Sequence, residues 1–241
     1  MRFPFEPRPA ELVFRADRPT GEWVLRRRSL PGGRRRYELI LNGKLLMDSA
    51  DGSTEAALAE AGLRACADGA DLHVLVGGLG FGYTLGAVLR DPRVRLAEVV
   101  ELEPTLFELL ATPEVRGDLG CPDLGDARVR LTAGDVRERL RGAREAYDCI
   151  LLDVDNGPES LSATGNGDLY TEEGLAASLR ALRPGGALAI WSSEPAPACL
   201  ARMRAVFGNA EERIVPAERD GRRLEYRILC GGQVRELRGA G

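Results

Sequence analysis

The chain has 241 residues, of which 44% are hydrophobic and 29% are charged. This balance is typical of a globular protein and excludes a disordered, collagen-like or coiled-coil chain. No apolar run approaches the roughly 20 residues that span a bilayer, and the first seven residues contain no apolar stretch of signal-peptide length. We therefore expect a cytoplasmic protein with no membrane partner. The formal net charge of −4 does not suggest a nucleic-acid partner either.

Arginine and cysteine are distributed in ways that limit the possible functions. Residues 1–36 hold ten arginines and four acids, and we interpret the runs 26–28 and 34–36 as the solvated face of a hairpin rather than a site for an anionic partner. The five cysteines have no CxxC spacing and His73 is the only histidine, so we expect no metal site. Widely spaced cysteines in an odd number fit a reducing compartment. A single histidine also argues against a Ser-His-Asp triad.

The first 52 residues predict a small antiparallel β unit. Two short strands are expected over 11–15 and 22–25, followed by strands 37–41 and 44–47 that meet at Asn42-Gly43. Asn-Gly supplies the positive φ angles of a type I′ turn, which favours a hairpin here. Because such a unit is too small to be stable alone, it must pack on the core or pair across a dimer. We expect the domain boundary between residues 1–52 and 53–241.

From residue 53 onward, strands and helices alternate. We expect a helix that starts with Ser53 as its N-cap, and then strands over 73–76, 97–101, 129–132, 149–152 and 187–191. Helices are predicted between them over 82–90, 104–111, 136–143 and 171–182, and a last hairpin over 212–215 and 224–229 turns around Arg219-Asp220-Gly221. This alternation predicts an α/β fold, with a parallel sheet covered by helices on both faces.

A glycine-rich turn follows the first strand of this α/β region. Gly78, Gly80 and Gly82 lie between the strand and a predicted helix. Glycines let the backbone approach a ligand closely, and the free N–H groups at a helix start face polar or anionic groups. Taken alone, the pattern fits a nucleotide site and a simple tight β–α turn about equally well.

Polar residues also follow three other strands. Glu101 comes about 20 residues after the glycine turn, the spacing of a carboxylate that binds ribose hydroxyls, although an acid at a helix start would look the same. Asp135 is expected to accept from an adenine amino group while Val136 N–H serves a ring nitrogen, and a role of Asp135 as helix N-cap is compatible with this. Asp153 and Asp155 follow the next apolar strand. Ligands bind outside the carboxyl ends of such strands, so we expect these side chains to converge.

A longer series of motifs resembles a known family. Residues 147–153 (Tyr-Asp-Cys-Ile-Leu-Leu-Asp) are followed by Gly157-Pro158, Leu169-Tyr170 and Leu182-Arg183-Pro184-Gly185-Gly186. In this order they are similar to motifs of the spermidine synthase (aminopropyltransferase) family, which has the class I S-adenosylmethionine-dependent methyltransferase fold. The resemblance covers about 37–230. It implies a doubly wound, mostly parallel seven-stranded sheet behind the small N-terminal β unit, and a homodimer.

The resemblance also implies a reaction and roles for individual residues. The donor would be decarboxylated S-adenosylmethionine or S-adenosylmethionine, the acceptor a small-molecule amine, and no metal would take part. Glu101 would hold the ribose, and Asp135 and Val136 would read the adenine. Asp153 would take or orient the proton of the attacking amine, and Asp155 would hold a cationic amine nearby.

Two departures from the family pattern leave alternatives open. Phe81 stands where the family has an acid that holds the donor's amino group, and the segment 54–57 (Thr-Glu-Ala-Ala) lacks the family's Tyr-Gln or Tyr-His pair. We therefore prefer an aminopropyltransferase-like enzyme and keep two alternatives: a methyltransferase with an unknown acceptor, and a non-catalytic protein that retains the fold. A dehydrogenase is disfavoured because Tyr83 stands where Gly-x-Gly-x-x-Gly requires its last glycine.

Overall fold

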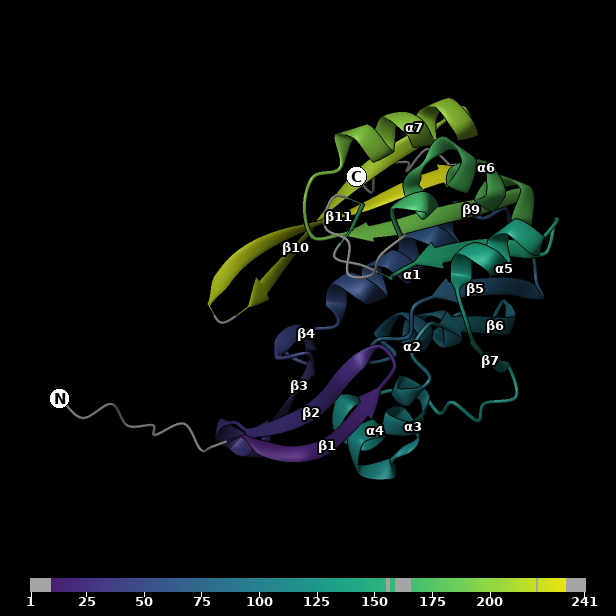
Figure 1. The fold of residues 1–241 in the computed structure, drawn as a ribbon. Helices are drawn as coiled ribbons and strands as arrows, with labels where there is room; N and C mark the ends of the chain where they lie inside the picture. Colours follow the sequence, from purple (N-terminus) through teal and green to yellow (C-terminus); the bar gives the residue numbers. More distant parts are fainter. Residues whose placement is uncertain (1–9, 155–156, 159–165, 220, 233–241) are drawn as a thin grey trace.

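The protein is described by a computed structural model that covers residues 10–154, 157–158, 166–219 and 221–232. Its elements form two separate sheets, one small and antiparallel and one large and mostly parallel (Figure 1). In chain order they are β1 (Glu11–Arg18), β2 (Gly21–Ser29), a 3-10 turn (Pro31–Gly33), β3 (Arg35–Leu41), β4 (Lys44–Asp48), α1 (Ser53–Ala65), β5 (Leu72–Gly77), α2 (Tyr83–Arg90), β6 (Val94–Glu101), α3 (Thr105–Ala111), α4 (Pro113–Leu119), β7 (Val129–Ala133), α5 (Val136–Gly142), β8 (Tyr147–Leu152), a second 3-10 turn (Asn166–Tyr170), α6 (Glu172–Ala181), β9 (Leu182–Ser192), α7 (Pro197–Phe207), β10 (Ala210–Arg219) and β11 (Arg222–Gly232).

The small sheet confirms the expected antiparallel β unit. Its strands follow the order β1-β2-β3-β4, and the turn between β3 and β4 has φ angles of 50° at Asn42 and 76° at Gly43. Alternate residues of β2 and β3 face inward: Trp23 and Tyr37 are at most 5% exposed and belong to the same core cluster as residues of the large sheet. The unit thus packs on the α/β region. The expected boundary between residues 52 and 53 falls in the connection from β4 to α1 and stays a prediction.

The large sheet has seven strands in the order β10-β11-β9-β8-β5-β6-β7. The strands from β9 to β7 run parallel to one another, whereas β11 is antiparallel to both β9 and β10. This confirms the doubly wound, mostly parallel sheet. The chain progresses from β5 toward β7 on one side and from β8 toward β10 on the other, so the order reverses between β5 and β8. At such a point the loops diverge and leave a crevice outside the carboxyl ends of the strands.

Helices cover both faces of the large sheet, and each face has its own core. Buried residues of α1, α2 and α3 form one apolar cluster together with the small sheet, and buried residues of α5, α6 and α7 form the other. The strands between these layers are apolar on both faces: Cys149, Ile150 and Leu151 in β8 are all fully buried. Continuous apolar strands of this kind are what a parallel sheet between two helical layers requires.

Three local features differ from the sequence-based expectations. Ser53 is the first residue of α1 and not its cap, since Gly52 occupies the cap position. Helices α4 and α7 were not predicted; both begin with a proline, which is compatible with the first turn of a helix because its missing N–H would have no partner there. The last hairpin is longer than expected, with ten paired positions between β10 and β11.

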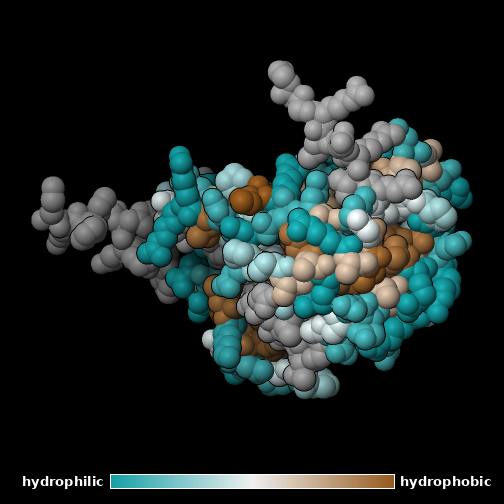
Figure 2. Space-filling model, turned by 90° about the horizontal axis from the view of Figure 1, so that it is seen from above, coloured by the Kyte–Doolittle hydropathy of each residue, from teal (hydrophilic) through white to brown (hydrophobic). Residues whose placement is uncertain are grey.

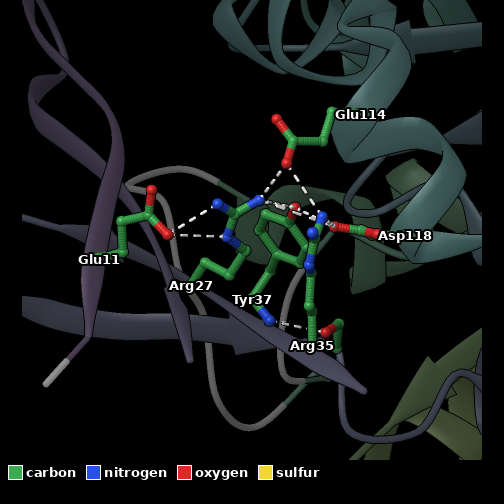
Figure 3. A network of polar contacts seen from close by, with 7 residues as sticks. Glu11, Arg27, Arg35, Tyr37, Glu114 and Asp118 are labelled. Atoms are coloured by element: carbon green, nitrogen blue, oxygen red, sulfur yellow. Dashed lines mark hydrogen bonds and ion pairs between the residues drawn. The ribbon is translucent and has the colours of Figure 1, made fainter. Parts of the chain in front are cut away.

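An ion-pair network joins the small sheet to α4 (Figure 3). Arg27 of β2 contacts Glu114 of α4, and Arg35 of β3 bridges Glu114 and Asp118 at 2.9 and 2.8 Å. The buried Tyr37 hydroxyl donates to Asp118 Oδ2 at 2.6 Å. Arg35 is exposed, as the interpretation of a solvated face predicts, whereas the Arg27 side chain is only 14% exposed. Both arginines also pair with α4 and so help to position the small sheet against the α/β region.

The surface seen from above is mainly hydrophilic, with apolar side chains interspersed among polar ones (Figure 2). The large apolar side chains with the highest exposure come from separate elements, for example Leu12 of β1 and Ile214 of β10. Among the described residues, no helix is long and apolar enough to cross a membrane.

Candidate active site

A cavity of about 650 Å³ lies at the carboxyl ends of the parallel strands. Its lining comes from the turn after β5 and from the residues that follow β6, β7 and β8, as well as from the start of α1. The small sheet closes one side with Trp23, Leu39 and Met47, and the β9–β11 pair closes another with Trp191 and Tyr226. The cavity therefore depends on the packing of the small sheet that the ion-pair network maintains.

Among the described residues, every titratable side chain of Asp, Glu, Lys, Arg or His that lines this cavity is acidic. Its described lining includes seven carboxylates and no lysine, arginine or histidine. The seven are Asp48, Asp51, Glu55, Glu101, Glu103, Asp135 and Asp153. Carboxylates gathered in a partly desolvated cavity repel one another, and a cationic ligand relieves this cost. The cavity is therefore electrostatically suited to a cation and unsuited to a phosphate.

Gly78 and Glu101 form the centre of the site. Gly78 has a φ of +89°, and a Cβ at this position would lie 2.2 Å from the backbone oxygen of Asp153, so only glycine allows β5 and β8 to end so close together. Glu101, at the end of β6, accepts from the N–H groups of Leu79 at 2.7 Å and Glu103 at 2.9 Å. It is 8% exposed, and burial raises its pKa above the ordinary value despite these hydrogen bonds. In this structure Glu101 thus fixes the glycine turn and lines the cavity.

Asp135 and Val136 lie at the start of α5 and also line the cavity. Asp135 is the N-cap, and its Oδ1 accepts from the Arg137 N–H at 2.8 Å. The Arg137 side chain holds the same carboxylate, and this contact lowers the pKa of Asp135. The N-cap role that the sequence suggested is confirmed. Arg137 is a further partner that sequence reasoning missed.

Asp153 follows β8 and faces the cavity from a half-buried position. Its Oδ2 accepts from the hydroxyl of Thr84, a buried residue of α2, at 2.8 Å. Burial is the main cause that raises the pKa of Asp153 to about 7, and the negative charges of Glu55 and Glu101 contribute in the same direction. A carboxyl group that titrates near neutral pH can both hold and release a proton under ordinary conditions.

The other predicted positions fall into three groups. Gly80 lines the cavity, and a Cβ at this position would lie 3.0 Å from Cε of Met47. Gly82 is not part of the lining; it is the N-cap of α2 with a φ of +79° and lies against Cys121. Phe81 is 4% exposed and belongs to the core, so it takes no place in the cavity. Asp155 lies outside the described residues.

Several residues of the lining were not singled out from the sequence for a role. Thr54 and Glu55 occupy the first turn of α1 and line the cavity where no family motif was recognised. The rings of Trp191 and Tyr226 pack together with centroids 5.3 Å apart, and aromatic faces attract cations. Trp191 and Tyr226 lie on different strands, and the start of α1 reaches the cavity only in the folded chain, so no local pattern in the sequence indicates these positions.

No protein-family model matches the chain. Polyamine aminopropyltransferase 2 of Streptomyces coelicolor is 34% identical over 157 residues, which are 65% of this chain and 27% of that protein. Putrescine N-methyltransferase 2 of Nicotiana tabacum is 30% identical over 118 residues, 47% of this chain and 30% of that protein. The spermidine synthase of Thermotoga maritima has a TM-score of 0.71 at 17% identity, covering 92% of this chain and 72% of that chain.

The fold and the cavity at the strand ends define a class I methyltransferase-like α/β protein. The comparisons support the more specific resemblance: the chain is similar in sequence to polyamine aminopropyltransferases and similar in fold to a spermidine synthase. The match to the Streptomyces coelicolor protein spans about a quarter of that relative's length. The activity and the substrates of the present chain are therefore proposed below rather than taken from that relative.

Proposed function

We propose that the chain is a transferase that moves an aminopropyl group from an adenosyl sulfonium donor to a small-molecule amine. The observation that carries this proposal is the charge of the cavity, whose described lining holds seven carboxylates and no cationic side chain. Decarboxylated S-adenosylmethionine is a dication and a polyamine is a polycation. Binding two cations in a cavity that is partly removed from water is favourable only where carboxylates offset the cost of desolvation.

In this proposal the donor occupies the half of the cavity formed by the glycine turn and the starts of α3 and α5. Gly78 and Gly80 leave room for the donor beside the backbone, and Glu101 accepts hydrogen bonds from the ribose hydroxyls. Asp135 and the Val136 N–H read the adenine edge. The carboxylate of Asp135 is already oriented by Arg137, so this part of the site is organised before a ligand arrives.

The chemistry requires a neutral amine in line with the carbon–sulfur bond of the donor. Asp153 takes one proton from the acceptor ammonium, and the nitrogen lone pair then attacks the carbon attached to sulfur. The carbon–sulfur bond breaks, and its electron pair stays on sulfur as a neutral thioether. Asp153 later releases the proton to solvent. Its pKa of about 7 suits this exchange, and the alignment of the two substrates supplies much of the acceleration.

Methyl transfer from S-adenosylmethionine to an amine is the second candidate. It is favoured by the relationship to the putrescine N-methyltransferase of Nicotiana tabacum, because the same in-line displacement moves either group. S-adenosylmethionine carries an additional carboxylate, which the acids of the cavity would repel. The charge of the cavity therefore supports the decarboxylated donor over S-adenosylmethionine.

Product analysis by mass spectrometry tests the proposal. The chain is incubated with each donor in turn and with a panel of diamines, and the mass added to the acceptor is measured. An added aminopropyl group from the decarboxylated donor supports the proposal, an added methyl group supports the second candidate, and no product with any donor and acceptor leaves the non-catalytic alternative. Asp153→Asn should lower turnover and leave donor affinity nearly unchanged, whereas Glu101→Ala and Asp135→Ala should lose donor affinity.

Three finer expectations accompany this proposal. Asp155 would hold a cationic amine near Asp153, the protein would act as a homodimer, and it would work in the cytoplasm. Sedimentation equilibrium measures the assembly state directly, and Asp155→Asn should raise the KM for the acceptor more than it lowers kcat.

A further inference from the structure

A second carboxylate, from a different element, lines the same cavity as Asp153 and acts on it by its charge. Glu55 lies in the first turn of α1, is half-buried and lines the cavity. Its Oε2 accepts from the hydroxyl of Thr54 at 2.6 Å, just as Asp153 Oδ2 accepts from the hydroxyl of Thr84 at 2.8 Å. The hydroxyls of Thr54 and Thr84 are buried, and each orients one carboxylate. The helices that carry them, α1 and α2, pack against each other.

The charged side chains that shift the pKa of Asp153 come from two different elements, and both are negative. Glu55 of α1 has the largest effect of any charged side chain and Glu101 of β6 a smaller one; both raise the pKa of Asp153, whereas the hydroxyl of Thr84 lowers it. Glu55 likewise contributes to raising the pKa of Tyr83, in α2, to about 12. The remaining acids of the lining, from β4 to α5, are Asp48, Asp51, Glu103 and Asp135.

The other five acids of the lining, Glu101 included, accept hydrogen bonds from neighbouring residues through both carboxylate oxygens. Asp48 binds the Arg36 side chain, and Asp51 accepts from both the N–H and the hydroxyl of Ser53. Glu101 accepts from the N–H groups of Leu79 and Glu103. Glu103 accepts in turn from the hydroxyls of Thr20 and Thr105. Asp135 accepts from the Arg137 side chain.

Asp153 differs from these acids. None of the hydrogen bonds among the described residues uses its Oδ1. Glu55 is the carboxylate whose charge acts most strongly on Asp153, and it lines the same cavity.

We propose that Glu55 is a further catalytic residue, which binds the acceptor amine together with Asp153 as a carboxylate pair. This inference rests on the proposed transferase function and adds a residue to it. Two carboxylates that act on each other across one cavity hold the acceptor ammonium better than one, because each repels the other's charge and the cation relieves this repulsion. One proton then passes from the ammonium to Asp153, and Glu55 remains ionised and stabilises the positive charge that develops on nitrogen as the carbon–sulfur bond breaks.

The pair also sets the pH at which transfer occurs. As long as Glu55 is ionised, Asp153 retains its proton to a higher pH than it would alone. Removal of the Glu55 charge should therefore lower the pH at which Asp153 becomes a carboxylate. A merely structural role of Glu55 would change stability or overall rate and would leave this pH unchanged.

The pH profile of kcat/KM for Glu55→Gln tests the proposal. Glutamine keeps the shape of the side chain and removes its charge. The midpoint of the acidic limb should fall by about one pH unit, and the KM for the acceptor should rise at least several-fold. Glu60→Gln is the matched control, because Glu60 lies on the same helix, is exposed and does not line the cavity; its profile should coincide with that of the unaltered protein.

The outcomes separate this inference from the function on which it rests. An unchanged midpoint and an unchanged acceptor KM in Glu55→Gln, with transfer intact in the unaltered protein, would overturn the role of Glu55 alone. Absence of transfer in the unaltered protein would overturn both proposals. If Glu55→Gln does not fold, as judged by circular dichroism, Glu55→Asp replaces it. That variant keeps the charge on a shorter side chain, and the proposal then requires a raised acceptor KM at an almost unchanged midpoint.

Discussion

The raised pKa of Asp153 predicts that removing its charge stabilises the fold. The pKa of this carboxyl is about 7 in the folded protein, compared with 3.8 for an unperturbed aspartic acid. The folded state therefore binds the proton more tightly than the unfolded state, and ionisation costs stability. The cost is absent below pH 3.8, grows as the pH rises and is complete above about pH 7. A shift of about three pH units corresponds to about 4 kcal/mol at most.

Asp153→Asn removes this cost and retains an oxygen that can accept from Thr84. The variant should gain stability over the unaltered protein with rising pH, and the gain should grow by about 2 to 3 kcal/mol between pH 5 and pH 8. Urea unfolding at the two pH values, followed by circular dichroism, measures this difference. A gain that is equal at both pH values, or a loss at both, would refute the assignment of a raised pKa to Asp153. An accompanying loss of turnover would be the usual exchange of stability for function at an active site.

Three further predictions concern the same residues and the packing around them. On the acidic side of its midpoint near pH 7, kcat/KM for transfer should fall about tenfold per pH unit, because the free enzyme must hold Asp153 ionised; a flat profile would remove Asp153 from the mechanism. Tyr37→Phe deletes the donor to Asp118 and should cost about 1.5 kcal/mol in urea unfolding, since Asp118 keeps Arg35 as a partner; a change below about 0.5 kcal/mol would show that the network contributes little. Phe81→Asp should destabilise the fold by about 3 to 5 kcal/mol because Phe81 is buried in the core, and a stable variant with improved donor affinity would instead return this position to the site.

The sequence predicted the order of strands and helices well because the apolar runs are strong and local. The β8 strand, for example, is a run of buried residues bounded by Asp148 and Asp153, and any such run between turn residues predicts a central strand. The carboxyl-end rule then predicted that Glu101, Asp135 and Asp153 converge, and all three line one cavity. Their proposed chemical roles remain to be tested.

Features that depend on contacts between distant segments could not be predicted in this way. Glu55 and Asp153 are about a hundred positions apart in the sequence and line the same cavity only because the start of α1 lies at the carboxyl ends of the strands. Phe81 was aligned with an acid of the family motif, yet its side chain is buried in the core while Gly80 lines the cavity. Adjacent residues in a turn face different directions. Aligning the family motif one position earlier would therefore place its acid at Gly80, which lines the cavity, instead of at the buried Phe81. The arginines of the small sheet were likewise judged from their run of charge, without the acids of α4 that bind them.

The most direct test of the cavity's charge compares two ligands that differ at sulfur alone. Isothermal titration calorimetry can measure the affinity of decarboxylated S-adenosylmethionine and of its demethylated thioether, in which the sulfur is neutral. With seven carboxylates around the cavity, the sulfonium compound should bind at least about tenfold more tightly, and the ratio should shrink as salt is added. Equal affinities for the two compounds at low salt would contradict the account, because the acids would then contribute nothing to the recognition of a cation.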